Sequence, residues 1–64
     1  MKKWIKINGY KINVTKLVAI FPIRDLGEEF GIEVYFVGGN SLVIRMPSKE
    51  EAIKAHGHLS LLAR

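Results

Sequence analysis

Cysteine is absent from this chain of 64 residues, so neither a disulfide nor a thiolate metal site can stabilise it. No apolar run approaches the ~20 residues of a membrane-spanning helix, and we expect a cytoplasmic protein with no membrane contact. A domain this small buries only about 60% of the surface of its unfolded chain. Yet 48% of the residues are hydrophobic. We therefore expect one domain over residues 1–64 that forms a homo-oligomer.

Acidic side chains are also few. The chain has 6 Asp and Glu against 10 Lys and Arg, which gives a net charge of +4. Such an excess favours an anionic partner, or it serves only to keep the protein in solution. The composition leaves both interpretations open.

The sequence near the start predicts a β-hairpin, because two runs of alternating apolar and polar residues flank Asn8 and Gly9. This dipeptide tolerates the positive φ angles of a two-residue turn, which places Lys6 opposite Lys11. Two like charges in direct opposition normally cost stability. One predicted face is apolar, with Ile5, Ile7, Tyr10 and Ile12. The other carries Trp4, Lys6, Lys11 and Asn13.

A second hairpin is predicted from residues 32–37 and 42–46, around a turn at 38–41. Before it, Asn13 or Thr15 can start one helical turn, and residues 17–21 form a strand. Pro22 marks the end of this strand, an edge or a bulge, and 24–29 form a loop. We expect Val37 to face Leu42 and Val34 to face Arg45. One face would then hold Tyr35, Val37, Leu42, Ile44 and Met46. The other would hold Ile32, Val34, Phe36 and Val43, interrupted by Arg45, so both faces are predicted to be apolar.

The C-terminal segment has the pattern of an amphipathic helix. Ser48 and Glu51 have the spacing of a capping box. Gly57 costs about 1 kcal/mol inside a helix relative to Ala, so an end near His56 is an alternative. The predicted fold is α+β, a small antiparallel sheet of about four to five strands from two hairpins, with this helix packed on one face.

One helix covers one side of a sheet, so the other apolar side should meet a second copy or a partner protein. The residues predicted for this interface are Tyr35, Val37, Leu42, Ile44, Met46 and Leu61, the last on the polar side of the helix. The main functional hypothesis is therefore a non-enzymatic interaction or regulatory protein that self-associates through sheet surfaces and binds a partner protein.

The alternative hypothesis is a binder of nucleic acid or an anionic nucleotide. Bases stack on an exposed tryptophan while lysines follow the phosphates. The residues predicted for this site are Lys2, Trp4, Lys6, Lys11, Lys16 and Arg45.

Catalytic and metal-binding patterns are missing. His56 and His58 would point about 200° apart on a helix, so they cannot share one metal ion. No serine lies in a Gly-x-Ser-x-Gly motif, and Gly38-Gly39-Asn40 lacks the Lys-Ser/Thr of a phosphate-binding loop. We expect no enzyme, no cofactor and no metal site.

One resemblance concerns the layout of the whole chain. It rests on Asn8-Gly9, Asn13, Val18-Ala19-Ile20, a later Gly-Asn turn and Ser48-Lys49-Glu50-Glu51. This order is loosely similar to that of small β-rich proteins of bacterial flagellar operons. The shared positions are turn and cap residues, and no role is carried over from them.

Overall fold

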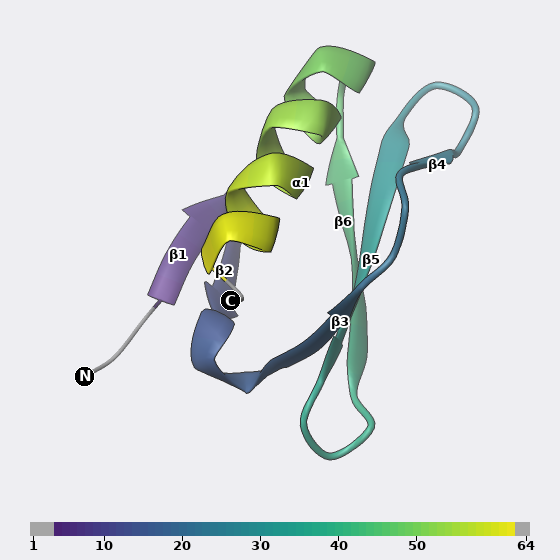
Figure 1. Ribbon diagram of the computed structural model, residues 1–64. Helices are drawn as coiled ribbons and strands as arrows, with labels where there is room; N and C mark the ends of the chain where they lie inside the picture. The colour runs from purple at the N-terminus through teal and green to yellow at the C-terminus, as the bar shows by residue number, and fades with distance from the viewer. Residues whose placement is uncertain (1–3, 63–64) are drawn as a thin grey trace.

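The computed structural model describes residues 4–62 and has the predicted α+β architecture (Figure 1). The elements follow one another as β1 (Trp4–Ile7), β2 (Tyr10–Asn13), the 3-10 turn η1 (Val14–Lys16), β3 (Leu17–Ile20), β4 (Arg24–Asp25), β5 (Phe30–Phe36), β6 (Ser41–Met46) and α1 (Lys49–Leu62). Among these residues, no helix is long and apolar enough to cross a membrane.

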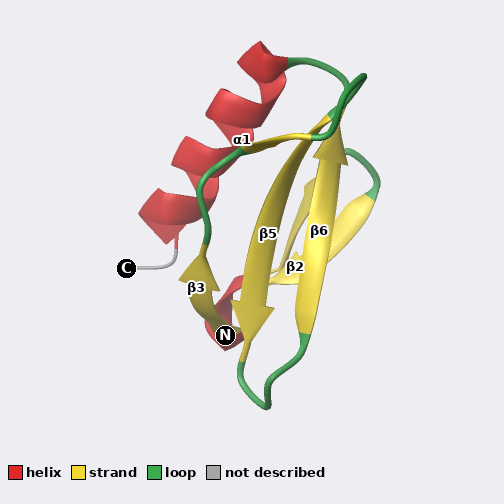
Figure 2. Ribbon diagram, turned by 90° about the vertical axis from the view of Figure 1, so that its right-hand side faces the viewer, coloured by secondary structure: helices red, strands yellow, loops and turns green. Residues whose placement is uncertain are grey.

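Strand β5 is the centre of an antiparallel sheet. It pairs with β6 along one edge and with β3 and β4 along the other. Strands β1 and β2 form a separate two-stranded sheet. Helix α1 and this first hairpin lie over the same face of the larger sheet. Figure 2 looks onto the opposite face, which no helix or strand of residues 4–62 covers. We call the latter the open face.

The first hairpin has the predicted register. Lys6 lies opposite Lys11 and Trp4 opposite Asn13, and the turn uses φ angles of 46° at Asn8 and 86° at Gly9. The Nδ2 atom of Asn8 also donates to the carbonyl oxygen of Arg45 at 2.6 Å, which ties the turn to the edge of β6. The apolar side of the hairpin faces inward, so Ile12 is only 1% exposed.

The predicted register of the second hairpin is wrong. Val34 lies opposite Leu42, not Arg45, and Ile32 lies opposite Ile44. The backbone N–H of Phe36 donates to the carbonyl of Asn40 at 2.8 Å, so residues 37–39 form a turn that is shorter than expected. The pairing is shifted by three residues, because Leu42 lies opposite Val34 and not Val37. Glycines 38 and 39, with φ angles of 98° and 88°, permit this turn because they have no Cβ.

This shift changes which residues share a face. When the pairing of two strands shifts by an odd number of residues, side chains that would have pointed to opposite faces of the sheet point to the same face. Apolar residues of β5 and β6 therefore gather under α1 and the first hairpin instead of dividing between two faces. The buried core consists of Ile12, Val14, Ile32, Val34, Ile44, Met46, Ala52, Ala55 and Leu59. The prediction that both faces of this hairpin are apolar does not hold for the open face, where Glu33 and Arg45 lie beside Tyr35 and Val43.

Helix α1 continues through Gly57 to Leu62. At its start, the backbone N–H of Glu51 donates to Oγ of Ser48 at 3.3 Å, as the capping box predicts. The Glu51 carboxylate accepts from the Ser48 hydroxyl at 3.4 Å rather than from its backbone N–H. The cap begins the helix next to the end of β6, and the chain then runs back across the sheet.

Candidate functional site

A shallow groove of about 310 Å³ lies where the outer side of the first hairpin meets η1 and the β5–β6 turn. We call it the Trp4 groove. Its lining residues are Trp4, Lys11, Asn13, Lys16, Phe36, Val37 and Asn40. The indole of Trp4 offers a large apolar surface here, since this residue is 49% exposed. An exposed aromatic side chain beside two lysines is therefore present in one concave surface.

Two backbone features bring the lining together. The N–H of Val37 donates to the carbonyl of Lys16 at 2.8 Å, which joins the β5–β6 turn to η1. Asn13 caps η1, because its Oδ1 accepts from the backbone N–H of Thr15 at 3.1 Å and from its hydroxyl at 2.6 Å. The groove is thus held by one hydrogen bond between segments that lie far apart in the sequence and by the local cap of η1.

The charge around the groove has one sign. Among the described residues, its lining includes Lys11 and Lys16 and no acidic side chain. Glu33 lies on β5 and pairs with Arg24 on the open face. The other acidic residues belong to β4, the β4–β5 connection and the first turn of α1, and they are Asp25, Glu28, Glu29, Glu50 and Glu51. Those segments lie at the end of the molecule opposite the β5–β6 turn (Figure 1). An anion in the groove would therefore meet cations without nearby carboxylates.

The structure brings together part of the predicted anion site. Trp4, Lys11 and Lys16 line the groove, whereas Lys6 lines a different hollow. Arg45 belongs to the open face, with its Nη1 atom 3.6 Å from Oε1 of Glu29. Lys2 lies outside the described residues. Sequence reasoning missed Phe36, Val37 and Asn40, because their place depends on a register that the pattern did not reveal.

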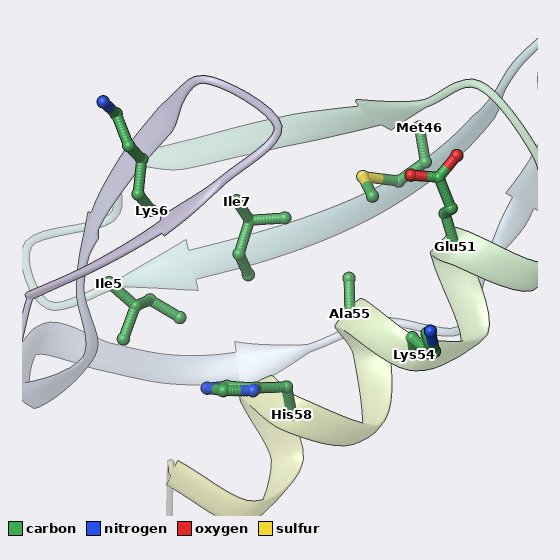
Figure 3. Close-up of a pocket in the computed structure, with 8 residues that line it drawn as sticks. All are labelled: Ile5, Lys6, Ile7, Met46, Glu51, Lys54, Ala55 and His58. Carbon is green, nitrogen blue, oxygen red and sulfur yellow. The ribbon is translucent and has the colours of Figure 1, made fainter.

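A larger hollow of about 540 Å³ separates the first hairpin from α1 (Figure 3). Ile5, Ile7, Met46 and Ala55 supply its apolar walls. Figure 3 shows the His58 ring reaching from α1 toward Ile5, while the Lys6 side chain points away from the helix. The side chain of Ala55 is a single methyl group, which is too short to fill the space between α1 and the first hairpin.

The open face is mixed in character. The rings of Phe21 and Tyr35 are stacked on it, with centroids 5.0 Å apart and an angle of 21° between the planes. Nη2 of Arg24 lies 3.3 Å from Oε1 of Glu33. The face therefore combines an exposed aromatic pair with ion pairs, and it is neither wholly polar nor continuously apolar.

The residues predicted for an interface do not form one surface. Ile44 and Met46 are 0% and 5% exposed in the core, and Leu42 is half-buried on the same side. Val37 lines the Trp4 groove, and Leu61 is exposed on α1. Of this set, Tyr35 alone lies on the open face, because the corrected register places Leu42, Ile44 and Met46 on the other side of the sheet.

Among the described residues, no group of three His, Asp or Glu side chains could hold a metal ion. The fold and the described surfaces define a small α+β protein with a basic, aromatic-lined groove. Comparison with protein-family models, with curated proteins and with solved structures finds no match to this chain. The residues of these surfaces are therefore the basis for inferring a function.

Proposed function

We propose that this protein binds nucleic acid, or an anionic nucleotide, in the Trp4 groove, without catalysing a reaction. The observation that carries the proposal is the meeting of Trp4, Lys11 and Lys16 in one groove that has no acidic side chain in its lining. Lysines attract phosphates at long range, and an exposed indole provides a stacking surface for a base.

Salt-dependent binding tests this proposal directly. We expect a fluorescent single-stranded DNA octamer to bind at low salt, with an affinity that falls steeply as salt rises. The variants Lys11→Gln and Lys16→Gln should each weaken binding and reduce the slope of log K against log salt by roughly 1. Lys49→Gln removes the same charge from the start of α1 and should change little. Equal losses in all three variants, or no binding at low salt, would contradict the proposal.

A second candidate function is self-association and partner-protein binding through the open face. The exposed Phe21–Tyr35 stack favours it, since aromatic side chains are enriched at protein interfaces. The ion pairs Arg24–Glu33 and Arg45–Glu29 would surround such an interface with polar groups. In this case the protein would act as a regulatory or structural subunit by occupying its partner.

A further inference from the structure

The cations of the first hairpin lie on one side of Trp4. Lys6 and Lys11 are opposite each other on β1 and β2, and Trp4 and Asn13 form the pair two residues farther from the turn. Alternate residues of a strand share a face, so both pairs belong to the outer side of the hairpin. In Figure 3 the Lys6 side chain accordingly points away from α1. The two pairs are separated by about 6.8 Å, the rise of two residues in an antiparallel strand.

Lys16 lies on the other side of Trp4. It ends η1, which continues from the end of β2 that is farther from the tight turn of the hairpin (Figure 1). Its carbonyl oxygen accepts from the N–H of Val37, which fixes η1 against the β5–β6 turn. Along the hairpin the order is therefore the Lys6–Lys11 pair, the exposed Trp4 and then Lys16.

This order distinguishes between the ligands that the proposed function leaves open. All the phosphates of a nucleoside 5′-phosphate are attached on one side of the sugar, so a base stacked on Trp4 would bring them to one group of lysines. A nucleoside inside a strand has one phosphate at its 5′ oxygen and another at its 3′ oxygen. Its base can stack on Trp4 while one phosphate meets Lys16 and the other meets the Lys6–Lys11 pair. In a duplex the neighbouring base pairs cover the faces of the base, so the strand must be unpaired.

We infer that the protein binds an internal nucleotide of a single strand rather than a free nucleotide, and that Lys6 belongs to the binding site although it lies outside the Trp4 groove. This inference rests on the proposed function. The strand crosses the outer side of the first hairpin, with one base stacked on Trp4. Its phosphate at the Lys6–Lys11 pair neutralises two ammonium groups that repel each other in the free protein.

Two small ligands that have the same charge when fully ionised test the inference. Thymidine 3′,5′-bisphosphate has a phosphate on each side of the sugar, whereas thymidine 5′-triphosphate has all its phosphates on one side. Trp4 is the one tryptophan of the chain, so its fluorescence reports stacking at this site. At low salt without divalent cations, we expect the bisphosphate to quench Trp4 and to bind roughly three- to tenfold more tightly than the triphosphate, the contribution of one further lysine–phosphate contact. Equal binding, or tighter binding of the triphosphate, would show that the inference is wrong while the proposed function stands.

The variant Lys6→Gln gives a second test, which decides the matter if neither small ligand binds measurably. We expect it to bind the single-stranded DNA octamer roughly three- to tenfold more weakly at low salt, with a slope of log K against log salt that is smaller by about 0.7. Lys54→Gln removes the same charge from α1, across the hollow of Figure 3, and should change little. Equal losses in the two variants, or no loss in Lys6→Gln, would show that Lys6 contacts no phosphate and that the inference is wrong. If the wild type does not bind the octamer at low salt, the proposed function itself fails.

Discussion

Lys6 lies directly opposite Lys11 across the first hairpin, so two ammonium groups share one exposed face. The ion pairs found among residues 4–62 are both on the open face, and neither includes these lysines. Like charges in this arrangement destabilise a strand pair. The free protein thus bears a repulsion that a bound anion would relieve, as expected if the hairpin serves binding rather than stability.

Replacing Lys6 by Gln should therefore stabilise the free protein. We expect the free energy of unfolding to rise by roughly 0.2–1 kcal/mol at low salt, measured by urea denaturation. The gain should shrink at high salt because screening already weakens the repulsion. The control is the same substitution in the Lys11→Gln background, where the opposed charge is already absent. An equal gain in that background would show that the effect does not come from the Lys6–Lys11 pair.

Self-association through the open face predicts a specific difference between two variants. Tyr35→Lys places a charge at the Phe21–Tyr35 stack, whereas Leu61→Lys places the same charge on the exposed side of α1. If copies meet through the open face, sedimentation velocity at micromolar concentration should show dimers for the wild type and Leu61→Lys and monomers for Tyr35→Lys. A monomeric wild type would rule out self-association under these conditions.

Gly57 lies in the interior of α1, and nothing approaches the position that a Cβ would occupy within 4 Å. Gly57→Ala should raise the free energy of unfolding by about 0.5–1 kcal/mol, because alanine loses less backbone entropy in a helix. Gly39→Ala is the matched control with the opposite expected sign, since Gly39 has a φ of +88°. Thermal unfolding followed by circular dichroism would measure both changes. A loss of stability in Gly57→Ala would contradict this account.

Gly31 is close to side chains on the open face. A Cβ added there would lie 2.8 Å from Cδ1 of Leu26 and 3.1 Å from Cγ1 of Val43. Gly31→Ala should cost about 1 kcal/mol, the low end for overpacking, because the exposed Leu26 side chain can move aside. In the Leu26→Ala background the same change should cost clearly less. Additive losses in the double-mutant cycle would show that Leu26 is not the side chain that resists the methyl group.

The candidate site was only partly visible in the sequence. Trp4, Lys11 and Lys16 were predicted from alternation and charge, and their positions on the hairpin and η1 are local consequences of the Asn8-Gly9 turn and the Asn13 cap. Phe36 and Val37 complete the groove through a hydrogen bond to Lys16 from a segment about twenty residues away. No local pattern marks such a contact. Arg45 was misplaced because its face depends on the strand opposite.

The two hairpins differ in what determines the pairing of their strands, which is the turn sequence in the first and tertiary packing in the second. Asn8 and Gly9 alone determine the register of the first hairpin, because a two-residue turn with positive φ angles permits one pairing. The turn at residues 37–40 permits more than one, since two adjacent glycines accept several conformations. Tertiary packing selects among them: opposing Ile32 to Ile44 places the apolar side chains of both strands on the side that α1 and the first hairpin cover. Burying that apolar surface in one core is the physical reason for the register, and the sequence of the turn could not reveal it.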